Sequence, residues 1–97
     1  MNAQITTIIV RFPVKLEKHE EFQFEFRKLL EKLRQEKTFV EARIHQDLDD
    51  SSIVVLYETY SESRDSFLKR VPNEPWFQAF LERLPSLLKR EREVFWN

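Results

Sequence analysis

The chain has 97 residues, a formal net charge of -1 and neither cysteine nor glycine. This length favours one domain over residues 1–97, and the balanced charge gives no electrostatic reason to expect nucleic acid as a partner. The missing cysteine excludes disulfides and thiolate chemistry, and the missing glycine excludes a Gly-rich phosphate loop, so a nucleotide cofactor is not expected. The apolar run ITTIIV stops at Arg11 and has no basic start, so we expect no signal peptide or membrane span and a cytoplasmic location.

The first 60 residues predict a strand, a helix and a hairpin. Residues 5–15 alternate and place Ile8, Val10, Phe12 and Val14 on one apolar face of a strand. Residues 17–36 predict a helix, because apolar side chains recur at helical spacing at Phe22, Phe26, Leu29, Leu30 and Leu33. Residues 38–46 and 53–60 predict two strands, joined by a turn at 47–52 that is rich in Asp and Ser.

The rest of the chain predicts an interrupted helix and a last strand. Ser61 is the expected N-cap of a short helix that runs to Arg70. After Pro72 and Pro75, apolar residues return to helical spacing, and Pro85 is expected to split this segment into two short helices. Residues 90–96 predict the final strand.

This order, βαββαβ, is typical of the ferredoxin-like plan, an α+β fold with four antiparallel strands and both helices on one face of the sheet. The plan leaves the other sheet face bare. The strand at 53–60 begins with Ile53-Val54-Val55-Leu56, which is apolar on both faces, and Ile9 lies on the far side of the first strand. We therefore predict a symmetric homodimer that forms through the sheet faces.

Three stretches of the sequence carry a resemblance to a known family. They are the opening strand with its Glu- and Leu-rich helix, the hairpin IHQDLDDSSIVVLYETY, and the late segment WFQAFLERLPSLL. Over nearly the whole chain, the arrangement resembles the antibiotic biosynthesis monooxygenase family of dimeric α/β-barrel proteins. Lys69 and Trp76 stand where many members carry histidine, and Thr38 stands where a glycine usually ends the first helix.

The resemblance implies a dimer with a small apolar cavity in each subunit, between sheet and helices. It also implies a cofactor-independent monooxygenase that oxidises a quinol-like or polycyclic phenolic substrate with O2. Such chemistry needs a base, hydrogen bonds to the developing anion and exclusion of water. The alternative is a non-enzymatic ligand-binding or stress-associated dimer on the same fold, and haem degradation is a third, weaker reading because of Lys69.

Three residues are the candidates for catalysis. His45 could titrate near neutrality, although it could equally be a surface histidine on its strand. Tyr57 could offer a hydroxyl to a substrate oxygen, or could lie in the core or the dimer interface. Glu58 lies on a central strand and must be paired or have a raised pKa, and the alternative to a base is an ion pair with Arg11 or Arg43.

Five further residues are candidates for substrate binding, namely Tyr60, Phe67, Lys69, Trp76 and Phe77. Tyr60 lies three residues after Tyr57, so the two side chains are expected on opposite sheet faces. The aromatic side chains could equally be plain core, and Lys69 could be solvated. No two histidines share a metal-binding spacing, so no metal site is expected.

Overall fold

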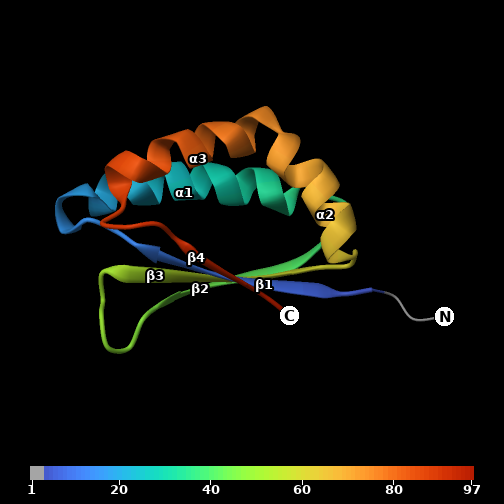
Figure 1. Cartoon of the computed structure of the whole chain (residues 1–97), viewed down its shortest axis with the longest axis horizontal. Helices are drawn as coiled ribbons and strands as arrows, with labels where there is room; N and C mark the ends of the chain where they lie inside the picture. The colour runs from blue at the N-terminus through green and yellow to red at the C-terminus, as the bar shows by residue number, and fades with distance from the viewer. Residues whose placement is uncertain (1–3) are drawn as a thin grey trace.

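The computed structural model describes residues 4–97 and contains one antiparallel sheet with three α-helices on one of its faces (Figure 1). The strands follow the order β2-β3-β1-β4 across the sheet, so the first and third strands are central. This is the predicted ferredoxin-like fold. The elements are β1 (Thr6–Pro13), the 3₁₀ turn η1 (Leu16–Lys18), α1 (His19–Arg34), β2 (Phe39–Gln46), β3 (Ile53–Tyr60), α2 (Arg64–Arg70), the 3₁₀ turn η2 (Val71–Asn73), α3 (Pro75–Leu87) and β4 (Glu93–Trp96).

Alternation along the two central strands decides which side chains enter the core. In β1, Ile8, Val10 and Phe12 are buried against the helices, as the sequence predicts, and the residues between them are only partly buried. In β3, Leu56 is paired with Val10 and faces the helices as well. The residues that point the other way form the open face of the sheet.

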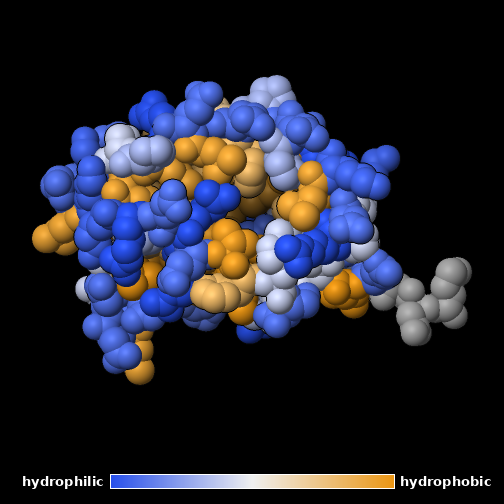
Figure 2. Space-filling view, in the orientation of Figure 1, coloured by the Kyte–Doolittle hydropathy of each residue, from blue (hydrophilic) through white to orange (hydrophobic). Residues whose placement is uncertain are grey.

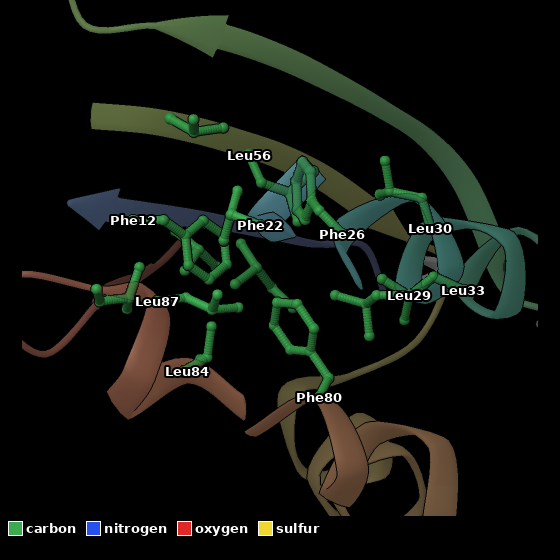
Figure 3. Packing of buried hydrophobic residues seen from close by; sticks show 14 of the residues in the cluster. Phe12, Phe22, Phe26, Leu29, Leu30, Leu33, Leu56, Phe80, Leu84 and Leu87 are labelled. Atoms are coloured by element: carbon green, nitrogen blue, oxygen red, sulfur yellow. The ribbon is translucent and has the colours of Figure 1, made fainter. Parts of the chain in front are cut away.

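The helix α1 buries the apolar stripe that its sequence predicts. Its rings pack on a sheet residue, since Phe12 lies 5.3 Å from Phe22 and 5.5 Å from Phe26 between ring centroids (Figure 3). Phe80 of α3 completes this group at 6.0 Å from Phe12. Aromatic pairs at these spacings add to the free energy gained from burial. This cluster therefore fixes α1 and α3 against the centre of the sheet.

Two details of the second helical region differ from the sequence prediction. The N-cap of α2 is Ser63, whose hydroxyl accepts a hydrogen bond from the Ser66 amide, and Ser61 instead bonds through its amide to the Thr38 carbonyl at 2.7 Å. The break between α2 and α3 falls at η2, where Pro72 and Pro75 predict it, but the split expected at Pro85 is wrong, because α3 continues past it to Leu87. Pro85 lies in the last turn, where the missing N–H costs one hydrogen bond without ending the helix.

The turn between β2 and β3 forms at residues 47–52, as predicted. The Asp47 carboxylate accepts hydrogen bonds from the Asp49 and Asp50 amides, both at 3.1 Å. The Asp50 carboxylate accepts from the Ser52 amide at 3.0 Å. No residue of 4–97 has a positive φ, so these side chains close the turn without a left-handed residue.

The open face of the sheet carries the side chains that point away from the helices. An apolar patch on it consists of Ile9, Val55, Tyr57 and Phe95, which occupy neighbouring strands. The exposed fraction is 37% for Tyr57 and 46% for Phe95. No helix among the described residues covers this face (Figure 1).

Candidate functional site

A cavity of about 170 Å³ lies between the sheet and the helices. Its walls come from the helix-facing side of the sheet, including Ile8 and Leu56, and from Leu33 and Phe80 on α1 and α3. Figure 2 shows apolar side chains around a hollow between the helices and the sheet, with hydrophilic residues at its rim. Only two of the lining residues are charged, Glu58 and Arg92.

Glu58 is held in the cavity wall by its place on a central strand. It is paired with Ile8 of β1 on one side and with Ala42 of β2 on the other. Paired residues share a sheet face, so its nearest cross-strand neighbours are apolar. The residue is only 5% exposed and lines the cavity beneath the helices. A carboxyl group in such surroundings is largely withdrawn from solvent, which disfavours its ionised form.

The Glu58 carboxyl has one hydrogen-bond partner. The Tyr60 hydroxyl, two residues along the same strand, donates to Oε1 at 2.7 Å. Within residues 4–97 no other hydrogen bond or ion pair reaches this carboxyl, so Oε2 has no partner there. Burial raises the pKa of Glu58 to about 7, and the Tyr60 hydrogen bond opposes part of that rise.

The expected ion pair of Glu58 with Arg11 or Arg43 is wrong. Both arginines point to the open face, where Arg11 pairs with Asp47 at 2.9 Å and Arg43 pairs with Glu41 at the same distance. Alternation along the strands places these guanidinium groups on the other side of the sheet from Glu58. Glu58 is therefore a buried carboxyl group without a compensating cation.

Tyr60 and Phe67 stand together beside this carboxyl. Tyr60 is fully buried, and its ring centroid lies 4.8 Å from that of Phe67 on α2. Phe67 also lines the cavity. Burial, and then the neighbouring Glu58, raises the pKa of the Tyr60 hydroxyl far above its usual value, so this group acts as a hydrogen-bond donor.

The other predicted substrate-binding residues are divided between the cavity and the surface. Phe77 of α3 lines the cavity. Trp76 points to a separate depression beside α1, and its indole Nε1 donates to Glu74 at 2.8 Å. Lys69 is exposed on α2 and does not line the cavity. The structure thus brings Glu58, Phe67 and Phe77 to one site and leaves Trp76 and Lys69 outside it.

His45 and Tyr57 lie on the open face of the sheet. Together with Glu41 and Arg43 they surround a shallow depression there. Tyr57 and Tyr60 are on opposite faces, as the spacing predicts. The catalytic roles of His45 and Tyr57 stay predictions, and within one chain the sheet separates both side chains from Glu58.

Arg92 is a cavity residue that sequence reasoning missed. It immediately precedes β4, and alternation puts it on the same side as Val94 and Trp96, which also line the cavity. Burial lowers the pKa of its guanidinium, and neighbouring Glu91 opposes that change. The alternation of residues 92, 94 and 96 was the signal that could have identified it.

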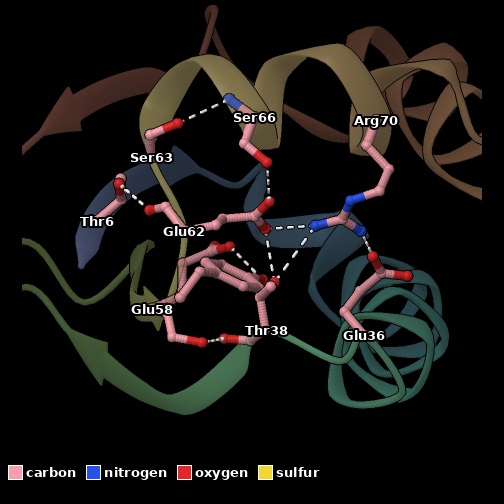
Figure 4. Close-up of polar contacts among 10 residues, drawn as sticks. Thr6, Glu36, Thr38, Glu58, Glu62, Ser63, Ser66 and Arg70 are labelled. Atoms are coloured by element: carbon pink, nitrogen blue, oxygen red, sulfur yellow. Dashed lines mark hydrogen bonds and ion pairs between the residues drawn. The ribbon is translucent and has the colours of Figure 1, made fainter. Parts of the chain in front are cut away.

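A second missed group is a polar cluster at the start of α2 (Figure 4). Buried Glu62 accepts hydrogen bonds from Thr38 at 2.6 Å and Ser66 at 2.7 Å, and it forms an ion pair with Arg70. Arg70 also pairs with Glu36 near the end of α1. The spacing of residues 62, 66 and 70 on one helical face could have indicated this cluster. It ties α2, and with it Phe67, to the rest of the fold.

Over residues 4–97, no three His, Cys, Asp or Glu side chains gather as metal ligands would. None of the helices in this range has the length and apolar composition that crossing a membrane requires.

Several solved structures are similar to this chain over nearly its whole length. A conserved protein from Methanosarcina mazei Go1 has a TM-score of 0.86 at 20% identity, with 96% of this chain and 90% of that one covered. PA3566 from Pseudomonas aeruginosa has a TM-score of 0.82 at 24% identity, with coverage of 100% and 94%. SnoaB from Streptomyces nogalater, a cofactor-independent oxygenase, has a TM-score of 0.77 at 22% identity, with coverage of 96% and 92%.

At these identities the likeness establishes the fold. No curated protein matches the chain. The family model for antibiotic biosynthesis monooxygenases matches residues 5–83, which include the strands β1, β2 and β3 and most of α3. The chain therefore belongs to the antibiotic biosynthesis monooxygenase family.

Proposed function

We propose that this protein is a cofactor-independent monooxygenase that oxidises a quinol-like or phenolic substrate with O2, and that Glu58 is its base. The observation that carries the proposal is a buried carboxyl group in an apolar cavity, with one oxygen oriented by Tyr60 and the other free of protein partners within residues 4–97. Family membership and the likeness to a cofactor-independent oxygenase support the same chemistry.

The pKa of Glu58 suits this role. A base is most effective when its pKa lies near the pH at which it works, and burial raises that of Glu58 to about 7. The carboxylate is then available near neutral pH, yet it is basic enough to take a phenolic proton. The apolar walls keep water from competing for that proton and strengthen the electrostatic interactions inside the cavity.

The reaction balances without a further reductant. Glu58 takes the proton of a ring hydroxyl, and the resulting phenolate transfers one electron to O2. The two radicals combine to form a carbon–oxygen bond, the oxygen–oxygen bond of the peroxide breaks, and the ring carbon loses its hydrogen as a carbonyl forms. A hydroquinone and O2 thus give a hydroxyquinone and one water, and Glu58 returns its proton to the departing oxygen.

We also propose that the working form is a homodimer joined through the open sheet faces. The support is the apolar patch of Ile9, Val55, Tyr57 and Phe95 at the centre of that face, flanked by the Arg11–Asp47 and Arg43–Glu41 ion pairs. A patch of this kind on a central sheet is suited to a self-complementary, two-fold contact. Such a contact would place His45 and Tyr57 in the interface.

The alternative is a non-enzymatic member of the family whose cavity holds a ligand without turnover. Oxygen uptake with a panel of hydroquinones and anthrones separates the two readings. We expect uptake well above that of buffer and of heat-denatured protein for at least one compound. With ¹⁸O-labelled O2, one labelled atom should enter the product and the other should appear in water. Uptake no faster than buffer across the panel would favour the non-enzymatic reading.

A further inference from the structure

The volume of the cavity limits the size of its ligand. At about 170 Å³ it is close to the size of an engineered cavity of about 150 Å³ that holds one benzene molecule. A single aromatic ring with small substituents fills such a space. Three fused rings would exceed it and would require the surrounding core, which includes Phe12 and Phe80, to move apart.

The cavity contains one positive charge, the guanidinium of Arg92. Arg92 is half-buried, and within residues 4–97 it forms no hydrogen bond and no ion pair through its side chain, with Glu58 or with any other residue. A guanidinium that is partly withdrawn from water and lacks an anionic partner favours an anion that a ligand would bring. Two other arginines near the sheet, Arg11 and Arg43, already have carboxylate partners.

The position of Arg92 indicates where that anion would lie. A wider depression of about 520 Å³ adjoins the cavity, and Arg92 and Leu81 line both of them. Arg92 therefore stands where the cavity meets the surface, whereas Glu58 lies on a central strand and is only 5% exposed as a residue. A ligand that meets both groups has its acidic hydroxyl inside and its anionic group at the entrance.

We infer that the ligand of this site is a single-ring phenol or hydroquinone bearing a carboxylate, with the carboxylate held by Arg92 and a ring hydroxyl facing Glu58. This inference deepens the proposed function and rests on it for the statement that the ligand is a substrate. It makes Arg92 the residue that determines specificity. A carboxylate suits this arginine because its two oxygens match the two parallel N–H donors of a guanidinium.

Calorimetric titration with compounds that are not readily oxidised tests the binding step alone. The probes are 4-hydroxybenzoate, its methyl ester and anthracene-2-carboxylate. We expect 4-hydroxybenzoate to bind on the order of tenfold to a hundredfold more tightly than the ester, as a charge-assisted hydrogen bond would give. Anthracene-2-carboxylate should bind at least about tenfold more weakly than 4-hydroxybenzoate, because its ring system exceeds the cavity.

Three variants assign the preference to one side chain. Arg92→Gln should abolish the difference between acid and ester, and Arg92→Lys should retain part of it because the charge remains. Arg90→Gln is the matched control, since Arg90 lines the outer depression and not the cavity. Circular dichroism confirms that each variant is folded. An ester that binds as tightly as the acid, a preference that survives Arg92→Gln, or tighter binding of the three-ring acid would overturn the inference.

Oxygen uptake with 2,5-dihydroxybenzoate, compared with its methyl ester, separates this inference from the proposed function. If the acid is preferred in binding but neither compound consumes oxygen, the ligand class stands and the monooxygenase proposal fails. If oxygen is consumed equally well with the acid and the ester, the monooxygenase proposal stands and the inference about Arg92 fails. Faster uptake with the acid, lost in Arg92→Gln, supports both.

Discussion

The Tyr60 hydroxyl donates a 2.7 Å hydrogen bond to the carboxyl of Glu58, two residues before it on the same strand. Residues two apart on a strand share a face, so this contact follows directly from their spacing. It fixes one carboxyl oxygen, and within residues 4–97 the other has no hydrogen-bond partner. Because the hydroxyl favours the ionised carboxylate, Tyr60 also sets how far burial can raise the pKa of Glu58.

Replacing Tyr60 with phenylalanine should move the pH dependence of the reaction. Without the hydroxyl the pKa of Glu58 rises above about 7, because the interaction that lowers it is gone. The base is active when ionised, so the acidic limb of kcat/KM should shift to higher pH. Tyr57→Phe should leave that limb in place, since Tyr57 points to the open face. A limb that does not move in Tyr60→Phe would contradict the role of this hydrogen bond.

The stability of the fold should depend on pH through Glu58. Its pKa is about 7 in the folded protein against an ordinary value of 4.5, so the folded state binds the extra proton between these values. The contribution of protonated Glu58 to the free energy of unfolding is fully present below about pH 4.5 and is lost as the pH rises through 7. At 1.36 kcal/mol per unit, the loss is on the order of 3 kcal/mol.

Urea titrations of the wild-type protein and Glu58→Gln at pH 5 and pH 8 measure the contribution of Glu58 to the free energy of unfolding. The glutamine side chain cannot ionise, so the variant should gain stability relative to the wild type by about 2.5 kcal/mol between the two pH values. Glu82→Gln, which removes an exposed carboxylate of α3, controls for the change in net charge. A difference between wild type and Glu58→Gln that stays constant with pH would show that Glu58 is ionised without penalty.

The polar cluster at Glu62 should contribute more to the free energy of unfolding than a surface ion pair does. Arg70→Met removes the partner of two carboxylates, one of them buried, and should cost about 2 kcal/mol of unfolding free energy. Arg34→Met, on the exposed face of α1, should change it by less than about 0.5 kcal/mol. Equal effects in thermal or urea unfolding would mean that the cluster does not hold α2 in place.

The proposed dimer predicts which aspartate substitutions on the surface separate the two subunits. Phe95→Asp and Tyr57→Asp place a charge in the apolar patch of the open face and should shift the protein toward monomer in sedimentation velocity runs. Phe24→Asp should leave the dimer intact, because Phe24 is 62% exposed on α1, on the other side of the sheet. A wild-type monomer at micromolar concentration would contradict the dimer itself.

The fold could be predicted from the sequence because its two periodicities are clear. The residues that the helical spacing of α1 and the alternation of β1 predict to be buried are buried in the structure. The cap of α2 could not be predicted, since Ser61 and Ser63 are both good N-caps. Their roles depend on the Thr38 carbonyl, which bonds Ser61 from a distant part of the chain. Pro85 was misjudged because its effect depends on its place in the last turn.

The candidate site was only partly predictable. The sequence placed Glu58 on a central strand, but its protonation depends on which face the arginines occupy, and that follows from the pairing of three strands. Phe67 and Phe77 reach the cavity while Trp76 and Lys69 do not, because small rotations of α2 and α3 decide which helical faces point inward. Predicting that Arg92 faces the cavity requires the register of β4 against β1, and the sequence of a four-residue strand barely specifies that register.

The most direct test of the account is oxygen uptake by Glu58→Gln at pH 8, where the wild-type carboxyl is largely ionised. With a hydroquinone that the wild type oxidises, kcat/KM should fall about 100-fold to 10,000-fold, the range expected when a general base is removed. Glu82→Gln should keep the wild-type value. An unchanged rate in Glu58→Gln would contradict the claim that this buried carboxyl group is the base.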